Sequence, residues 1–203
     1  MATRADLLDA FRAAHAKLKR GRLLVVGSQS ILGSHSEDEL PEDVTMSVEF
    51  DMALLDDSQS GLAADVLDAE FGEMSPFHAE HGWHIQGVSP KTAKLPVGWE
   101  ERAVVLEVEG VSQSSVSMCL EPHDLCASKL ARNEAKDRSY VASLVQAGLV
   151  NANLVRARLD TIPLDDDFTA DRRRVSIQWI KSMQARRSGE RGEAHEQKPG
   201  LAP

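Results

Sequence analysis

Apolar and polar positions follow two different periods along the chain, and the change between them divides it into two parts. Apolar residues recur at helical spacing over residues 5–19, which predicts an amphipathic helix that Gly21 ends. Short apolar or alternating runs then predict strands. These runs are residues 23–26, 44–50, 83–88, 103–109 and 116–120. We therefore expect a sheet within residues 1–120, with further helices over 29–32 and 60–71.

Helical periodicity dominates after Pro122, where Gly148 and Pro163 separate successive apolar faces. The predicted helices span residues 122–132, 133–147, 151–159 and 165–186. From residue 188 the composition is that of a disordered tail. The layout predicts an α/β (α+β) fold in which residues 1–120 form a mixed sheet with flanking helices. Residues 121–187 form a helical C-terminal part packed on it, and 188–203 a tail.

The formal net charge of −9 is unevenly distributed along the 203 residues. No Lys or Arg occurs between Arg22 and Lys91, whereas basic residues concentrate in the first helix, over residues 129–138 and over 172–191. Segregated charge can present a basic face to RNA while an acidic pocket gathers metal ions. Solvated charged faces, the basic terminal helix among them, are the alternative.

Three features point to a cytoplasmic protein without a membrane partner. No segment approaches the roughly 18 apolar residues that a membrane helix needs. The N-terminal residues lack the apolar segment of a signal peptide. Cys119 and Cys126 are too few for a disulfide framework, so we expect reduced thiols in the core.

Gly27 and Ser28 follow the first apolar run and open a short predicted helix. Backbone N–H groups and a serine hydroxyl at such a turn can bind a phosphate. An ordinary strand-to-helix turn with a serine cap has the same sequence.

Glu49 and Asp51 lie two residues apart in a predicted strand, which projects both carboxylates to one face. Hard oxygen ligands of this kind suit a magnesium–triphosphate site. Nucleotidyl transfer often requires a third carboxylate, for which Glu107 and Glu109 on the later strand have the same spacing. Solvent-facing acids on a strand are the alternative.

Lys129, Lys136 and Asp137 lie in the predicted helical part. If the two helical segments were continuous, the lysines would be one heptad apart and share a face. They could then reach phosphate oxygens, with Asp137 orienting one of them. A surface helix with salt bridges is the alternative.

His78, His81 and His84 recur every third residue, a spacing that can place imidazoles around zinc. Gly82 interrupts the helix that this would need. A structural histidine, or His78 lining the site, is favoured over a zinc-dependent hydrolase.

The Gly-Ser turn, the strand carboxylates and the segment His123-Asp124-Leu125 … Ser128-Lys129-Leu130 … Lys136-Asp137 together resemble the minimal nucleotidyltransferase fold. More narrowly, they resemble uncharacterised bacterial proteins related to AbiEii-like toxin nucleotidyltransferases. Residues 72–78, 82, 87–88 and 95–99 are also similar to that group. The resemblance covers roughly residues 20–160.

The resemblance implies roles for these residues. Gly27 and Ser28 would contact the nucleoside triphosphate, Glu49 and Asp51 would hold Mg²⁺ or Mn²⁺, and Glu107 would be the third carboxylate. Lys129, Lys136 and Asp137 would lie near phosphate or substrate. The family's usual Asp-x-Asp pair is Glu49-x-Asp51 here, and the added methylene displaces a ligand oxygen by about an ångström, enough to cost about 100-fold in rate.

The expected activity is transfer of a nucleotidyl group from a nucleoside triphosphate to a hydroxyl of RNA, tRNA among the candidates, or of protein. The implied setting is a toxin–antitoxin or phage-defence system, with a cognate antitoxin as partner. The alternative is a catalytically inactive nucleotidyltransferase fold that serves as a nucleotide-binding or protein-interaction module.

Overall fold

The computed structural model describes residues 1–19, 21–56 and 61–196, with side chains in the last helix to residue 186. Within these residues five strands form one mixed sheet in the order β3-β2-β1-β5-β4. The strands are β1 (Gly21–Val25), β2 (Glu49–Leu54), β3 (His84–Gly87), β4 (Val104–Leu106) and β5 (Ser115–Cys119). β1 pairs parallel to β5 and antiparallel to β2, while β2 is parallel to β3 and β4 antiparallel to β5. The predicted mixed sheet with flanking helices is confirmed.

The apolar run in the central strand β1 is explained by its position, since Leu23, Leu24 and Val25 are all fully buried. In β2, by contrast, buried Phe50 and Met52 alternate with partly exposed acids. Cys119 and Cys126 are free and buried, and burial raises the pKa of each thiol to about 12. Both thiols are therefore core residues, as expected.

The second strand begins five residues later than the alternating pattern predicted. Val44 belongs to a 3-10 helix, and β2 begins only at Glu49, which pairs with His84, the first residue of β3. The fourth strand is also shorter than predicted, since only three of its residues pair with β5. Apolar alternation therefore marked both strands but not their ends.

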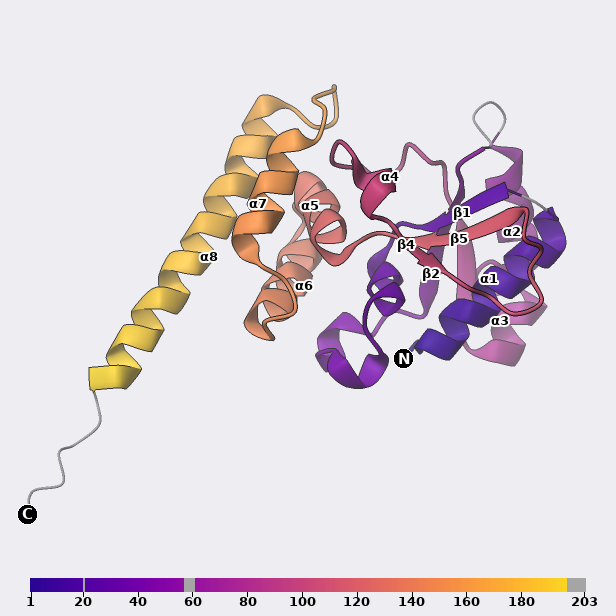
Figure 1. The fold of residues 1–203 in the computed structure, drawn as a ribbon, viewed down its shortest axis with the longest axis horizontal. Helices are drawn as coiled ribbons and strands as arrows, with labels where there is room; N and C mark the ends of the chain where they lie inside the picture. The colour runs from indigo at the N-terminus through magenta and orange to yellow at the C-terminus, as the bar shows by residue number, and fades with distance from the viewer. Residues whose placement is uncertain (20, 57–60, 197–203) are drawn as a thin grey trace, which may run out of the picture.

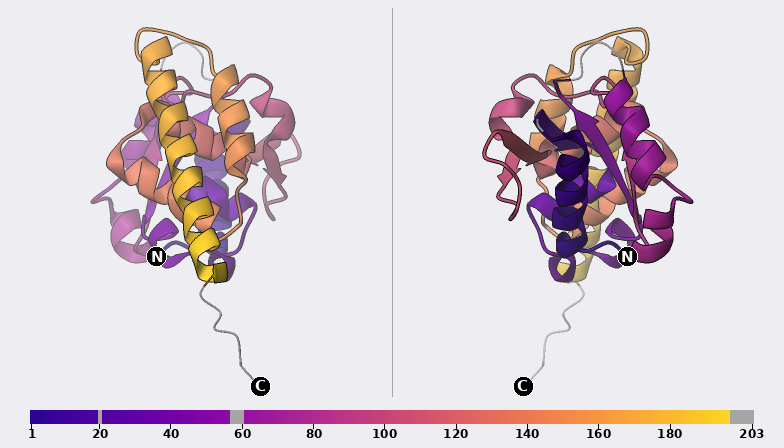
Figure 2. Two further views of the ribbon diagram at one scale, coloured as in Figure 1. Left: turned by 90° about the vertical axis from the view of Figure 1, so that its left-hand side faces the viewer. Right: turned by 90° about the vertical axis from the view of Figure 1, so that its right-hand side faces the viewer.

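Helices α1 (Arg4–Leu18) and α2 (Leu62–Phe71) pack on the sheet, and Figure 2 shows α1 running along it. Shorter helices connect the strands. They are η1 (Ser28–Gly33), η2 (Glu37–Glu39), η3 (Glu42–Val44), α3 (Pro76–His81) and α4 (Trp99–Arg102). Ser60, where the second long helix was expected to begin, lies outside the described residues.

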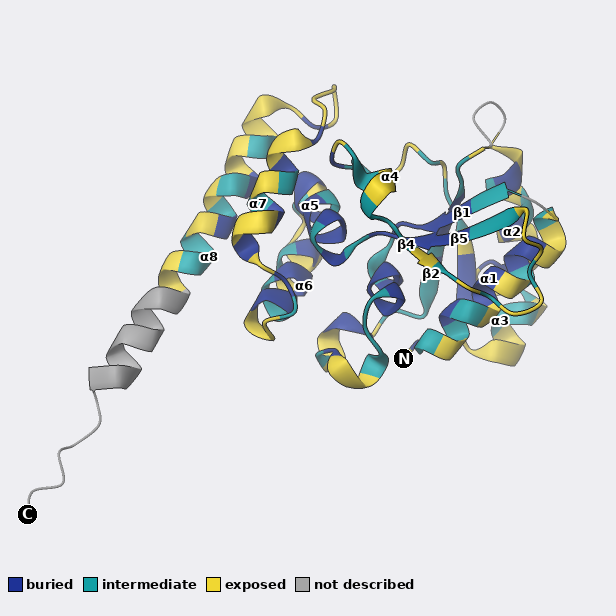
Figure 3. Ribbon diagram, viewed as in Figure 1, coloured by how far each residue is buried: buried dark blue, intermediate teal, exposed yellow. Residues whose placement is uncertain are grey.

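The helical part comprises α5 (Pro122–Arg132), α6 (Ala135–Gln146), α7 (Ala152–Thr161) and α8 (Ala170–Glu196). Figure 1 shows these helices gathered on one side of the molecule, with the sheet and α1–α3 on the other. In Figure 3 the buried residues of α5 continue the buried core of the sheet. α8 continues to Glu196, beyond the predicted helix end at residue 186, and residues 197–203 lie outside the described part. None of the helices described is both long and apolar enough to cross a bilayer.

A buried carboxylate fixes α5 against its neighbours. Asp124 has no exposed side-chain surface, and Arg102 of α4 donates hydrogen bonds to its two oxygens at 2.8 and 3.1 Å. Arg158 of α7 lies 3.3 Å from the same carboxylate. Three segments distant in sequence therefore meet at one charge near the start of α5.

Asp124→Asn should strongly destabilise the fold. The change leaves two partly buried guanidinium groups without their counter-charge, and breaking such a pair costs about 3 kcal/mol. Urea unfolding would measure the loss. Asp171→Asn is the control, because Asp171 pairs with Arg174 at the surface and should contribute less than about 1 kcal/mol. Equal losses in the two variants would contradict the anchoring role.

Candidate functional site

The turn after β1 lies directly against the acidic strand β2. The Val26 N–H donates to the Asp51 carbonyl at 2.9 Å, and the next residue, Gly27, is extended. A Cβ built on Gly27 would lie 1.7 Å from Oδ2 of Asp51. A glycine is therefore required here, because any larger residue would displace the Asp51 carboxylate from the turn.

Ser28 is held from two sides by the helical part. Nζ of Lys129, on α5, donates to the Ser28 hydroxyl at 2.9 Å. The Tyr140 hydroxyl, on α6, donates to the Ser28 carbonyl at 2.7 Å. The Lys129 ammonium also lies 4.3 Å from the centroid of the Tyr140 ring, a cation–π contact. The Gly-Ser turn, the lysine and the tyrosine thus form one unit.

Asp137 orients the cations of this unit. Arg132 donates two hydrogen bonds to the Asp137 carboxylate, at 2.8 and 2.6 Å, and Lys129 lies 3.8 Å away. Burial would raise the pKa of Asp137, but Arg132 and Lys129 outweigh it and hold that pKa below its usual value. Burial lowers the pKa of Lys129, and Asp137 opposes this. Asp137 therefore stays ionised and supports a positive charge beside Ser28.

A cavity of about 320 Å³ opens in front of these groups, within the size range of small-ligand sites. Its wall combines the Gly27 backbone and Asp51 with cationic side chains from three segments. The lining residues are Val26, Gly27, Asp51, Thr92, Ala93, Lys94, Ser128, Lys129, Ala131, Arg132, Asp167 and Arg172. The cations suit a polyanion such as a triphosphate, and the carboxylate suits a metal ion bound to it.

Glu49 and Asp51 share one face of β2, as predicted. Burial, and then the hydrogen bond and negative charge of Asp51, raise the pKa of Glu49 to about 7. Such mutual repulsion is relieved by a divalent cation between the carboxylates, so the pair fits Mg²⁺ or Mn²⁺. Among the described residues no three His, Cys, Asp or Glu side chains gather around one metal position. Two carboxylates are nonetheless sufficient for Mg²⁺ when substrate phosphates supply further ligands.

Glu107 is not brought to this site. It follows Leu106, which pairs with Ser117, and Ser117 pairs with Leu23, so β4 runs away from the Gly27 end of the sheet. Its exposed side chain lies toward the opposite end. Glu109, the other candidate, follows in the same direction. The expectation of a third carboxylate from this strand is therefore not met, because β4 is antiparallel to β5.

Lys136 lies at the rim rather than on a common helix face with Lys129. α5 ends at Asn133, whose φ of 58° is left-handed, so the two helical segments are not continuous. The Lys136 side chain is 73% exposed and lies 3.7 Å from Glu134. Its charge still acts on Glu49, where it opposes the rise in the pKa of that carboxyl.

The three histidines do not converge. The ring of His81 stacks on Phe77, and Nδ1 of His78 accepts from the Met74 N–H at 3.2 Å. His84 is buried on β3, where Nε2 lies 3.8 Å from the Glu49 carboxylate and the ring centroid 4.8 Å from that of His78. Their contacts are those of structural residues beside the acidic strand.

Several residues in or beside the cavity were not anticipated. Arg132 and Tyr140 each lie three residues after a predicted site residue, Lys129 and Asp137, so helical spacing could have suggested them. Lys94 carried no local signal, and Arg172 was noted only within the basic run over 172–191, because both are distant in sequence from the turn.

The fold and site define an α/β protein in which Asp51, one of two neighbouring strand carboxylates, lines a cavity with cationic side chains. Residues 5–187 match the family described as "Nucleotidyltransferase of unknown function (DUF6036)". The match spans most of the chain, so the protein belongs to this family. No curated protein and no solved structure matches it.

The paired carboxylates predict a pH-dependent stability. The folded state keeps the Glu49 proton up to about pH 7, whereas the unfolded chain releases it near 4.5, so stability falls as the pH rises through this window. In Glu49→Gln this loss is absent. Melting temperatures of both proteins, measured in chelator across this window, should diverge in favour of the variant as the pH rises. A difference independent of pH would contradict the assignment.

Tyr140→Phe should separate the two contacts of this side chain. The variant loses the hydrogen bond to Ser28 but keeps the ring beneath Lys129, so we expect about 1 kcal/mol of destabilisation. Tyr140→Leu also loses the ring and should unfold at distinctly lower urea. Phe and Leu variants of equal stability would show that the ring contributes nothing to holding the lysine.

Proposed function

We propose that the protein is a metal-dependent nucleotidyltransferase. It moves a nucleotidyl group from a nucleoside triphosphate to a hydroxyl of RNA, with tRNA among the candidates, or of protein. The observation that carries the proposal is the contact of Asp51 with Gly27 on one side of the turn and of Lys129 with Ser28 on the other. Acid and cation thus flank one backbone segment at the wall of a single cavity.

In this mechanism the chain's own residues bind and orient the triphosphate. Backbone N–H groups at Gly27 and Ser28, with Lys129 and Arg132, hold phosphate oxygens. Glu49 and Asp51 would hold Mg²⁺ or Mn²⁺, which when bound would supply neutralisation of phosphate charge and help to position the attacking hydroxyl. The ammonium of Lys129 stabilises the pyrophosphate as it leaves, and Asp137 keeps that ammonium in place.

A second candidate is a catalytically inactive nucleotide-binding or protein-interaction module. One observation favours it: Glu107, the carboxylate expected to complete the set, lies toward the other end of the sheet. The longer side chain of Glu49, in place of the aspartate usual in the resemblance, points the same way. The module would retain the phosphate contacts of the cavity without transfer.

The biological setting belongs to the same proposal. The resemblance to bacterial AbiEii-like toxins supports a cytoplasmic role in a toxin–antitoxin or phage-defence system, with a cognate antitoxin as protein partner.

Label transfer tests the proposal. The full chain is incubated with Mg²⁺ or Mn²⁺, each α-labelled nucleoside triphosphate in turn, total RNA and cell protein. Asp51→Asn should reduce transfer at least about 100-fold, because the variant retains the shape of the site but loses a metal-binding charge. Asp65→Asn, at an exposed position of α2, is the matched control and should transfer normally.

Label on RNA or on protein identifies the acceptor. No label from a folded wild-type sample, together with retained triphosphate binding, would favour the inactive module. Equal transfer by wild type and Asp51→Asn would contradict the assigned site.

A further inference from the structure

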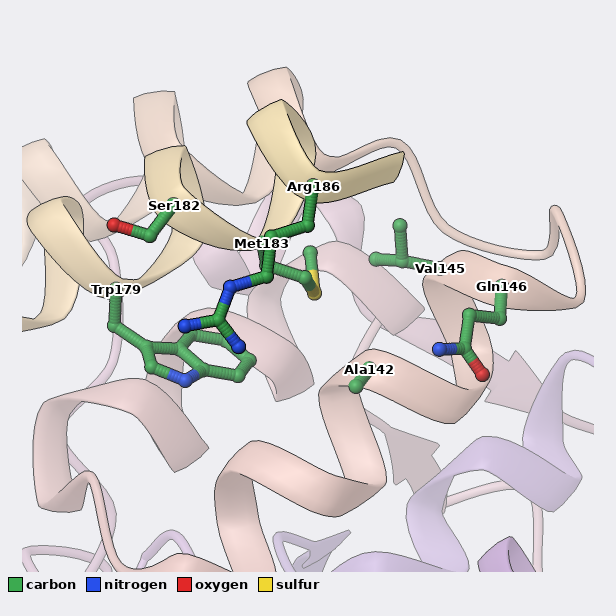
Figure 4. Close-up of a pocket in the computed structure, with 7 residues that line it drawn as sticks. All are labelled: Ala142, Val145, Gln146, Trp179, Ser182, Met183 and Arg186. Atoms are coloured by element: carbon green, nitrogen blue, oxygen red, sulfur yellow. The ribbon is translucent and has the colours of Figure 1, made fainter. Parts of the chain in front are cut away.

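A second pocket lies between α6 and α8 in the helical part. Its volume is about 350 Å³, and it combines an aromatic ring, apolar side chains and polar groups. The lining residues are Ala142, Val145, Gln146, Trp179, Ser182, Met183 and Arg186. Figure 4 shows the Trp179 indole at one side of this pocket, with the Arg186 side chain extending from α8 toward it.

The pocket is aligned with the candidate active site along α8. Arg172 lines the cavity that contains Asp51 and Lys129, whereas Trp179 and Arg186 line the second pocket. These three residues are spaced by seven, so they fall on nearly the same side of the helix, about 10 Å apart. One side of α8, which we call the α8 stripe (Arg172, Trp179 and Arg186), therefore leads from the cavity to the pocket.

We propose that the α8 stripe binds single-stranded RNA and leads its reacting end to the cavity. This rests on the proposed function for the identity of the cavity, and it selects RNA from the two acceptor classes. Unstacked RNA bases bind by stacking on aromatic rings and by hydrogen bonds to their edges, while arginines bind the phosphates. Trp179 provides the ring, and Arg172 and Arg186 provide charge.

The charge of α8 supports a nucleic acid as the occupant. Among its charged side chains to residue 186, Asp171 is acidic, and the others are Arg172, Arg173, Arg174, Lys181 and Arg186. The chain as a whole carries −9, so this basic helix is a local feature within an acidic protein. A polyanion is thereby directed to α8 and repelled from the acidic remainder.

Binding of a fluorescent single-stranded RNA of about twelve nucleotides, measured by anisotropy, tests the proposal. The protein is full-length and carries Asp51→Asn, so that no transfer accompanies binding. Trp179→Ala should weaken binding roughly ten- to hundred-fold, and Trp179→Phe should retain much of the affinity. Arg186→Gln should weaken binding and reduce the dependence of log affinity on log salt by about 0.7.

Lys181→Gln is the matched control. Lys181 lies nine residues from Arg172, on the opposite side of α8, and its exposed side chain carries the same charge as Arg186. The expected result is wild-type affinity and an unchanged salt slope. Circular dichroism and thermal melting check that each variant is folded. If Trp179→Ala does not fold, RNA binding by Trp179→Phe and Arg186→Gln still tests the proposal.

The proposal is overturned if RNA does not bind, if the stripe variants bind as tightly as the parent, or if Lys181→Gln weakens binding as much as Arg186→Gln. Label transfer then separates the two proposals. Stripe-dependent binding without transfer by wild type would overturn the enzymatic function alone. Transfer with stripe-independent binding, or label on protein and not on RNA, would overturn the RNA path alone.

Discussion

The carboxylate of Asp51 lies so close to Gly27 that a single methyl group on that residue would displace it. The contact joins the turn after β1 to the acidic strand β2, and the antiparallel pairing of these strands makes it possible. Because the turn is fixed on this side, Lys129 and Tyr140 can hold Ser28 from the other. Both contacts shape the cavity wall, so the site depends on Gly27 having no side chain.

Each buried charge of the helical part is compensated by partners from more than one segment or by a paired side chain. Asp124 binds arginines from α4 and α7, and Asp137 binds Arg132 with Lys129 nearby. Without these partners, burying each charged group would cost several kcal/mol of folding free energy. The need for pairing therefore limits the ways in which α5 can pack. The same network that positions α5 therefore presents Lys129 to the turn. The contacts that hold the helical part together therefore also shape the candidate site.

Charge is segregated in space as well as in sequence. β2 carries the paired acids, and the loops and helices opposite supply the cations of the cavity. Lys94 lies within reach of Asp165 and Asp167, so that the loop before α8 also contributes to the balance of charge. The basic helix α8 begins at this cavity and extends away from the body of the molecule (Figure 1). Within an acidic protein, the arginines at the start of α8 therefore lie beside the candidate site.

Local sequence patterns were sufficient to predict much of this fold. The alternation around Glu49 and Asp51 placed both on one face, helical periodicity predicted α5 over 122–132, and the Gly-Ser turn was recognised at the end of a buried strand. These features depend on interactions between residues close in sequence. Strand order and direction do not, and they decided that Glu107 lies toward the far end of the sheet. The left-handed residue Asn133, which separates Lys129 from Lys136, and the meeting of Lys94 and Arg172 at one cavity likewise depend on packing between distant segments. The sequence determined which groups could do chemistry, and the tertiary structure decided which of them meet.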